Sequence, residues 1–506
     1  MRDGGRRARE TRGGGERARR YHGLRHPFAP QRVFSDDAIA AIHGNALKIL
    51  EELGLVVLLP EARALYRAAG ASVDKDTGLV RIGREIVEAA LASAPRSIRL
   101  RARDPARDVL LEPGAMVFHA GAGCPQAHDR ERGRRPGRLE DFREIMRLID
   151  GFDAIHLMAA AVEPQDSPVV RRHYDTTLIQ LETSTKVPFI YARGRAQVTE
   201  AFEMLAMASR TGADFAADPQ CFTVINTNSP RILDAPMAEG IIDFARAGQV
   251  TMITPFCLMG AMAPVTLAGA LSLQHAEALA GITLAQLARA GAPVLYGAFA
   301  SNVAMKSGAP AFGTPEHMLA TLASGQLARH IGLPWRGSSG AAANMADAQG
   351  ATETTLATMA AMMAGATVTI HAAGWLEGGL TFGYEKFITD LEVLQSLAEL
   401  CTVPGADPED LAFEAIASVP PGGHFFGSEH TMSRYRTAFY EPLVADWSNF
   451  GQWTEAGSLR ADERATRIWK ERLASFTPAK GVEEGLDSVR AFASRRIAEG
   501  GAAPSS

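Results

Sequence analysis

Apolar runs of strand length alternate with segments of helix length through the middle of this chain. Runs such as 154–158 and 250–253 are almost continuously apolar, as in parallel strands that are covered on both faces. Eight runs, each followed by a helical segment, predict an α/β protein with a closed (β/α)₈ TIM barrel. An open, doubly wound sheet is the alternative. The predicted strands are 116–121, 154–162, 188–192, 222–228, 250–258, 293–299, 333–339 and 367–374.

The segments that flank the barrel differ in composition. Residues 1–32 are rich in arginine and glycine, with few large apolar groups, which predicts a disordered basic tail. This tail is interpreted as a solvated leader, a transit peptide or an electrostatic arm. The expected order is a basic tail (1–32), an N-terminal helical elaboration (33–111), the barrel (112–402), a C-terminal helical extension packed on the barrel (403–499) and a disordered tail (500–506).

Composition indicates a cytoplasmic enzyme, for which we also expect a homo-oligomer. The 506 residues carry a net charge of -5, with 46% hydrophobic and 22% charged residues, and the acidic body argues against nucleic-acid binding. The four cysteines are widely spaced, which is typical of a reducing compartment and not of a disulfide framework. No apolar run approaches the length of a membrane span, so no membrane partner is expected.

Familiar catalytic motifs are absent from the sequence. No strand is followed by GxGxxG, and neither a GxxxxGK[ST] loop nor HExxH occurs. His119, Cys124 and His128 lie near one another in the sequence, but nothing close by completes a metal-binding set. We therefore predict no metal site.

The ends of the predicted strands carry aromatic and small residues instead of an acid–base pair. Because barrel active sites lie at the C-terminal ends of strands, Tyr296, Phe299 and Trp375 are candidates to frame a cation with their ring faces. Glu377 would add a countercharge. Glycines flank Trp375 and Glu377 after an apolar strand, a pattern that lets another molecule approach the backbone closely.

Several separate segments carry a resemblance within residues 34 to about 476. They are 259–270, 313–316, 347–349 with Glu353, 372–377, 384–386 with Asp390, 422–425 and 430–431. Together they resemble the trimethylamine methyltransferase (MttB-like) family. The family is a (β/α)₈ barrel, and the resemblance implies transfer of a methyl group from a small methylated amine to the corrinoid of a cognate partner protein. The corrinoid is then carried by that partner and not bound tightly here.

One position departs from the family's archaeal members, which carry pyrrolysine before the Asp-x-Gln motif. Gly340, or a neighbour, occupies that place here, so the chain resembles the branch without pyrrolysine. Assigned members of this branch act on quaternary amines such as glycine betaine, and a glycine would leave room for a bulkier substrate. A Co(I) corrinoid is a strong nucleophile, so such a reaction needs no catalytic base.

These arguments give the predicted site. We expect His371 and Glu377 in catalytic roles, and Arg336 or Arg193 to pair with a betaine carboxylate. His424 and His430, after the barrel, would face the corrinoid partner or pin the C-terminal extension. The substrate-binding set is Tyr296, Phe299, Trp375, Gly340, Arg336 and Arg193.

Two other functions remain open at this point. One is a barrel enzyme that acts on another small acid, such as a lyase or hydrolase, which needs a titratable acid–base pair and often a metal. The other is a catalytically silent barrel that binds a partner. The alanine-rich segment 341–343, where the family is more polar, keeps that second possibility in view.

Overall fold

The computed structural model describes residues 21–209, 215 and 217–505. Within this part of the chain, eight parallel segments close into a barrel. Residues 155–160 and 187–191 complete the ring through bridges of Leu157 with Val187 and of Phe189 with Phe222. The predicted (β/α)₈ architecture is confirmed. The other six segments form one sheet in the order β6 (Val117–Phe118), β17 (Val368–Ile370), β16 (Trp335–Ser338), β13 (Val294–Gly297), β11 (Val250–Ile253) and β9 (Phe222–Ile225).

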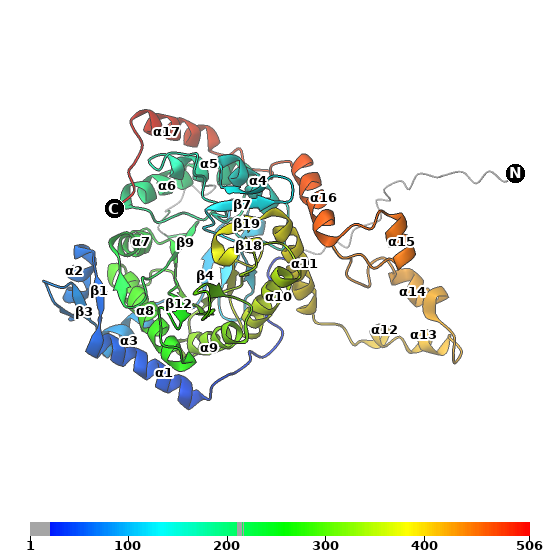
Figure 1. Cartoon of the computed structure of the whole chain (residues 1–506), viewed down its shortest axis with the longest axis horizontal. Coiled ribbons are helices and arrows are strands. Elements are labelled where there is room, and N and C mark those ends of the chain that lie inside the picture. Colours follow the sequence, from blue (N-terminus) through cyan, green and yellow to red (C-terminus); the bar gives the residue numbers. More distant parts are fainter. Residues whose placement is uncertain (1–20, 210–214, 216, 506) are drawn as a thin grey trace.

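Helices surround this ring (Figure 1). Strand residues alternate between two apolar layers: Leu295 belongs to the barrel interior, whereas Val294 and Tyr296 pack outward with the helices. This alternation follows from the two-residue period of a strand. The helices are α4 (Leu139–Asp150), α5 (Arg172–Thr183), α6 (Arg195–Ala208), α7 (Ala235–Arg246), α8 (Leu267–Ala288), α9 (Pro315–Ile331), α10 (Ala348–Met363) and α11 (Tyr384–Leu400).

Additional strands lie at the C-terminal ends of the barrel strands and extend the barrel at this end. We call this end the mouth. One group, β12 with β14 and β15, extends the fifth and sixth barrel strands. The other group joins a hairpin after the first strand to the segment after the eighth. Their bounds are β12 (Phe256–Met259), β14 (Phe299–Val303), β15 (Pro310–Ala311), β7 (Gln126–Asp129), β8 (Gly133–Pro136), β18 (Trp375–Leu376) and β19 (Thr381–Gly383).

The opposite end of the barrel is closed by a hairpin of β4 (Ile98–Leu100) and β5 (Val109–Leu111). Its apolar side chains belong to the same buried cluster as the barrel interior. Backbone bonds from Arg101 N to Pro219 O (2.7 Å) and from Arg103 N to Thr185 O (3.0 Å) hold it against residues just before two barrel strands. Access to the barrel interior is therefore from the mouth.

The N-terminal elaboration combines helices with a small sheet. Ser35 caps α1 (Asp36–Lys48) by accepting a hydrogen bond from Ala38 N at 3.2 Å. The π-helical turn Ile49–Leu53 extends α1. The sheet has the order β10 (Ile232–Leu233), β1 (Leu55–Val57), β3 (Leu79–Arg81) and β2 (Ser72–Val73), beside α2 (Pro60–Ala68) and α3 (Arg84–Ser93).

The structure differs from the expectation of a disordered tail at each end of the chain. Residues 1–20 lie outside the described part, but 21–32 run along the closed end of the barrel, where Met116 N donates to Leu24 O at 2.9 Å. Residues 500–505, expected to be disordered, are bound through their backbone. Ser505 N donates to Arg193 O at 3.0 Å, and Gln197 Nε2 donates to Ala502 O at 2.8 Å.

The C-terminal extension has a packed part and a projecting part. Helix α16 (Ala461–Ala474) packs along α11, and α17 (Leu486–Ala498) packs along α5 and α6. Between α11 and α16 the chain projects from the barrel (Figure 1). This projecting part contains α12 (Pro408–Leu411), α13 (Phe413–Ala417), α14 (Glu429–Arg434) and α15 (Phe450–Glu455). In the part of the chain that is described, no helix is both long and apolar enough to cross a membrane.

A buried lysine near the closed end of the barrel generates a pH-dependent prediction. Lys186 is 1% exposed and donates to the carbonyls of Ile149 (2.7 Å), in the last turn of α4, and Phe152 (3.0 Å), just after that helix. Burial lowers the pKa of Lys186 to about 7, although Asp150 partly opposes the shift. The folded state thus binds fewer protons than the unfolded state between that value and the ordinary lysine pKa. Its stability must rise as the pH increases from about 7 towards 10.

The substitution Lys186→Met removes this titration. In differential scanning calorimetry, we expect the difference between the melting temperatures of wild type and variant to change by several degrees between pH 7 and 10, in favour of the wild type at high pH. A difference that stays constant across this range would contradict the assignment. Lys470→Met, at an exposed lysine paired with Glu131, is the control and should show no such trend.

Candidate functional site

The mouth of the barrel contains a packed aromatic cluster built from the sixth and eighth strand ends. His371 stacks on Trp375 with ring centres 4.5 Å apart and planes 21° apart. Phe299 lies 5.6 Å from His371 and 5.8 Å from Trp375, and Phe312 lies 5.1 Å from Trp375. The structure thus brings together His371, Trp375 and Phe299, as the sequence predicted, and adds Phe312. Nothing in its local sequence marked Phe312 as a site residue.

Arg336 lies beside this cluster as an unusually buried cation. It is 2% exposed, its Cζ lies 5.3 Å from the centre of the Phe299 ring, and its Nη2 donates to His371 Nε2 at 3.2 Å. Arg336 also donates to Ser338 Oγ. No Asp or Glu side chain among the described residues forms an ion pair with it, and burial lowers its pKa.

The charge of Arg336 affects both neighbouring histidines. Burial, reinforced by Arg336, lowers the pKa of His119 to about 4 and that of His371 well below the ordinary value. Both imidazoles are therefore neutral at physiological pH, and His371 acts as a hydrogen-bond acceptor towards Arg336. The site consequently carries one positive charge, on a guanidinium that remains protonated.

Two donors of this cluster are buried without a hydrogen-bond partner among the described residues: Arg336 Nε and Trp375 Nε1. Buried donors are nearly always paired in folded proteins, so their concentration here indicates a site for an acceptor. Four residues at the mouth are only half-buried, namely Ala122, Ala342, His371 and Glu377.

The loop that carries His371 and Trp375 has an unusual backbone. His371 and Glu377 have φ angles of 61° and 53°, in the left-handed region that non-glycine residues rarely adopt. Asp390, paired with Lys386 on α11, accepts a hydrogen bond from Gly374 N at 2.9 Å and fixes the middle of the loop. This contact explains the family-like Lys386 and Asp390 as positioning residues.

The alanine-rich loop after β16 is held by α10 and by the neighbouring loop. Glu353 Oε2 accepts from Ala342 N (2.8 Å) and Ala343 N (2.9 Å), and Gln349 Nε2 donates to Glu353 Oε1 at 2.8 Å. Glu377 N donates to Ala343 O at 3.0 Å. The segment 341–343 therefore keeps a defined shape through its backbone, without polar side chains.

Gly340 does not provide free space for a substrate, because Trp375 occupies it. A Cβ at position 340 would lie 2.4 Å from Trp375 Cε3, and position 340 has a φ of 134°. The indole also packs on Gly379 and Gly121, where a Cβ would lie 2.5 and 3.2 Å from it. The expectation that Gly340 leaves room for a bulkier substrate is wrong, because these glycines accommodate the indole.

Glu377 lies at the mouth but is already ion-paired. Its carboxylate accepts from Arg134 Nε at 2.9 and 3.1 Å and from Thr381 Oγ1 at 3.1 Å. Its charge is thus largely compensated by Arg134, on the β7–β8 hairpin. Apart from the arginine-rich composition of residues 130–138, no feature of the sequence indicates this pair.

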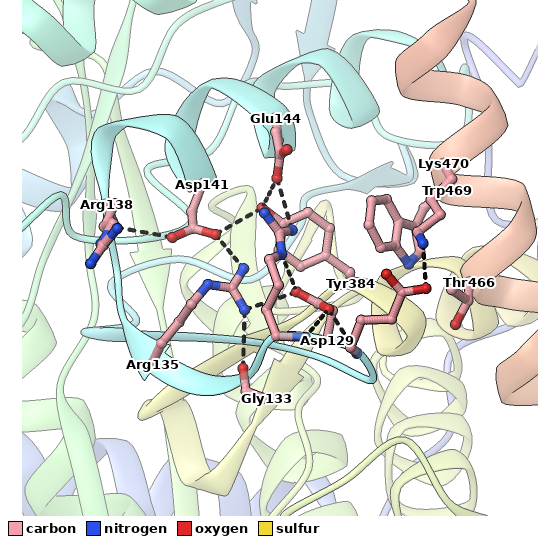
Figure 2. Close-up of polar contacts among 12 residues, drawn as sticks. Asp129, Gly133, Arg135, Arg138, Asp141, Glu144, Tyr384, Thr466, Trp469 and Lys470 are labelled. Carbon is pink, nitrogen blue, oxygen red and sulfur yellow. Dashed lines mark hydrogen bonds and ion pairs between the residues drawn. The ribbon is translucent and has the colours of Figure 1, made fainter.

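A buried network holds this hairpin in place (Figure 2). Asp129 accepts from Arg132 and Arg135, and Arg135 also pairs with Asp141 on α4. Tyr384, at the start of α11, donates to Glu144 at 2.6 Å. The charges of the hairpin are therefore mutually compensated, and the hairpin presents Arg134 to Glu377 from a rigid support.

Three predicted contributions to the site are not found at the cluster. Tyr296 points outward to α8, where its hydroxyl lies 3.1 Å from His275 Nδ1, so its assignment to the site is wrong. The reason is strand alternation, which places Leu295 inside. His424 and His430 lie on the projecting part of the extension, away from the barrel (Figure 1).

Arg193 lies in a different environment from Arg336. Its guanidinium binds both carboxylate oxygens of Glu163 and covers the Tyr191 ring at 4.1 Å. It borders a separate cavity of about 160 Å³ between α5 and α6, which Pro504 helps to close and which shares no lining residue with the aromatic cluster. Arg336 is therefore the better candidate to bind a substrate carboxylate.

The predictions that the protein has no metal site and no membrane partner are based on the sequence alone. Across residues 21–209, 215 and 217–505, no group of three or more His, Cys, Asp or Glu side chains is arranged to hold a metal ion. The chemistry supported by the cluster is binding of an anion at Arg336 and enclosure of an adjacent group by aromatic rings.

Comparisons with known proteins identify the family of the chain. The family model described as trimethylamine methyltransferase (MTTB) matches residues 2–501. A glycine betaine methyltransferase of Desulfitobacterium hafniense (strain Y51) is 33% identical over 471 residues, 93% of this chain and 98% of that protein. The trimethylamine methyltransferase MttB of Desulfitobacterium hafniense (strain DSM 10664 / DCB-2) is 31% identical over 478 residues, 93% of this chain and 95% of that protein.

Among solved structures, the monomethylamine methyltransferase MtmB of Methanosarcina barkeri aligns with a TM-score of 0.46 and 10% identity, over 93% of this chain and 96% of that chain. The match of the family model over nearly the whole chain settles the family. The chain belongs to the trimethylamine methyltransferase family.

Proposed function

We propose that this enzyme transfers a methyl group from a small quaternary amine that bears a carboxylate, such as a betaine, to the corrinoid of a partner protein. The observation that carries the proposal is Arg336, a buried guanidinium without a carboxylate partner among the described residues. Glycine betaine is the substrate named for one relative. Trimethylamine, named for another relative, has no anionic end that would use this charge.

The substrate would be oriented by its two ends. Its carboxylate would accept from Arg336, whose Nε is buried without a partner, and from the Trp375 indole N–H. Its cationic end would lie against the aromatic rings of the cluster, which attract a cation without hydrogen bonds. Glu377, already paired with Arg134, would then stabilise the loop and only weakly attract the ammonium.

Methyl transfer requires no proton from this site. When the C–N bond breaks, its electron pair stays on nitrogen, so a quaternary ammonium departs as a neutral tertiary amine. The reduced corrinoid of the partner supplies the nucleophile. The neutral imidazole of His371 suits this chemistry, because its role is to orient Arg336 through the 3.2 Å hydrogen bond. The chain's contribution is orientation and exclusion of water.

The direct experiment mixes the purified enzyme with its corrinoid protein in the reduced state and follows the corrinoid absorbance. Glycine betaine and related carboxylated quaternary amines are compared with choline, tetramethylammonium and trimethylamine. We expect methylation with a carboxylated quaternary amine and little or none with the others. Activity confined to trimethylamine would contradict the proposal.

The substitution Arg336→Met separates binding from stability. Removing a buried charge that lacks a carboxylate partner should leave the ligand-free protein as stable as the wild type or more stable. The same change should abolish the stabilisation by an active betaine, about 2.7 kcal/mol at a hundredfold excess over Kd, which is detected as a rise in melting temperature.

Arg193→Met is the matched control for this prediction. It breaks the ion pair with Glu163 and should lower stability, while the betaine-induced shift persists. Both are measured by differential scanning fluorimetry with and without ligand. A ligand shift that survives in Arg336→Met and disappears in Arg193→Met would move the carboxylate site to Arg193.

The glycines around Trp375 generate a second variant series. In Gly340→Ala, the added Cβ would lie 2.4 Å from the indole, so the ring must move. We expect at least a tenfold loss of kcat/KM and a changed tryptophan emission. In Gly121→Ala, the nearest contact is 3.2 Å and only a small adjustment is required, so activity should fall much less. Equal losses in the two variants would show that the position of the indole does not matter.

A further inference from the structure

The projecting part of the C-terminal extension exposes a large apolar surface. We call residues 402–439, which include α12, α13 and α14, the arm. None of these residues is buried, and Figure 1 shows the arm separated from the barrel. Its exposed large apolar side chains are Val403, Leu411, Phe413, Ile416, Phe425, Phe426, Met432, Tyr435 and Phe439.

The arm nevertheless has defined local structure. Asp407 caps α12 through hydrogen bonds from Glu409 N and Asp410 N, both 2.9 Å, and Ser428 caps α14. Glu409 and Arg434 form an ion pair between the two helices. Helices of four to six residues are unstable in isolation, because nucleation is costly and few hydrogen bonds repay it. Burial of their apolar residues against another surface would stabilise such short helices.

The exposed area is large enough for a stable interface. Phe413, Phe426 and Phe439 are 73%, 81% and 83% exposed, and the adjacent Trp447 and Phe450 are 72% and 78% exposed. Since a buried aromatic side chain covers about 150–250 Å², the arm and these two residues together expose on the order of 1,000 Å² of apolar surface. Twice this area, from two chains, falls within the range of obligate homodimers.

The composition of the arm also fits the centre of a permanent interface. Between Glu414 and Glu429 there is no Asp, Glu, Lys or Arg, and this stretch contains His424, Phe425 and Phe426. Centres of interfaces are depleted in charge and enriched in aromatic residues. An apolar patch is complementary to a copy of itself, so a second chain brings the matching surface by symmetry.

The location of the arm argues against the corrinoid protein as its occupant. Helix α11 runs antiparallel to the barrel strands and ends near the closed end, where Glu399 contacts Tyr21 and Cys401 contacts Met362. The arm therefore leaves the barrel at the end opposite to the mouth. A methyl acceptor must reach the mouth and leave in every turnover, whereas this surface is too apolar to be left uncovered.

We propose that the arm is the interface between two copies of this chain, packed arm against arm about a two-fold axis. His424 and His430 then belong to this contact and not to the site in the barrel. The proposal does not depend on the identity of the methylated substrate.

Sedimentation velocity of the full chain tests the proposal with the double substitution Phe426→Asp and Phe439→Asp. Neither side chain is buried in its own chain, so the fold should remain intact in far-UV circular dichroism. We expect the wild type to have a mass that is an even multiple of 54.0 kDa. The variant should have half that mass or less, because charges in a closed apolar contact are costly.

Leu53→Asp, at a side chain that is 52% exposed on the N-terminal elaboration, is the control and should keep the wild-type mass. Hydrogen exchange of the wild type supplies a second readout. Amides of 402–439 should be protected at high protein concentration and should exchange faster on dilution. A monomeric wild type, or a double variant with unchanged mass, overturns the proposal. So does an arm that becomes protected only when the corrinoid protein is added.

Discussion

The burial of one positive charge governs the organisation of the barrel mouth. Arg336 is 2% exposed, and a guanidinium in such a place costs several kcal/mol unless an anion or good hydrogen bonds compensate for it. The protein supplies the hydroxyl of Ser338, the imidazole of His371 and the face of Phe299, all of them neutral. Burial, reinforced by this charge, lowers the pKa of His371 and keeps it unprotonated. The mouth therefore holds an uncompensated positive charge that an anionic ligand would neutralise. Among the described residues it offers no proton donor, and methyl transfer from a quaternary amine needs none.

The other charges near the mouth serve to shape it. Glu353 binds the backbone of the alanine-rich loop, the Lys386–Asp390 pair binds Gly374 N, and Arg134 binds Glu377. Each of these charges has a partner, so none competes strongly with Arg336 for a ligand. Because these charged residues bind backbone groups of the loops, a loop of small residues keeps a defined conformation. This pairing also explains why the acidic residues shared with the family do not have to act as acids or bases.

Much of the barrel could be predicted from the sequence, because continuous apolar runs mark strands covered on both faces. The same property hides which side of a strand faces inward. In 294–296 every residue is buried, so only the closed barrel shows that Leu295 points inward and Tyr296 outward. Contacts between distant residues were equally inaccessible: Arg134 and Glu377 are 243 positions apart. Residues 500–505 looked disordered because they are small and polar, yet they bind through backbone hydrogen bonds that composition does not reveal.

The antiparallel course of strands and helices in a (β/α)₈ barrel has a further consequence for this chain. The eighth strand delivers His371 and Trp375 to the mouth, and α11 then carries the chain back to the closed end before the arm begins. The aromatic cluster and the start of the apolar arm therefore lie at opposite ends of the barrel. A permanent contact between chains at the arm leaves the mouth accessible, so a partner protein can approach and depart without disturbing the assembly. Since the two surfaces share no residue, substitutions at one should have additive effects with substitutions at the other.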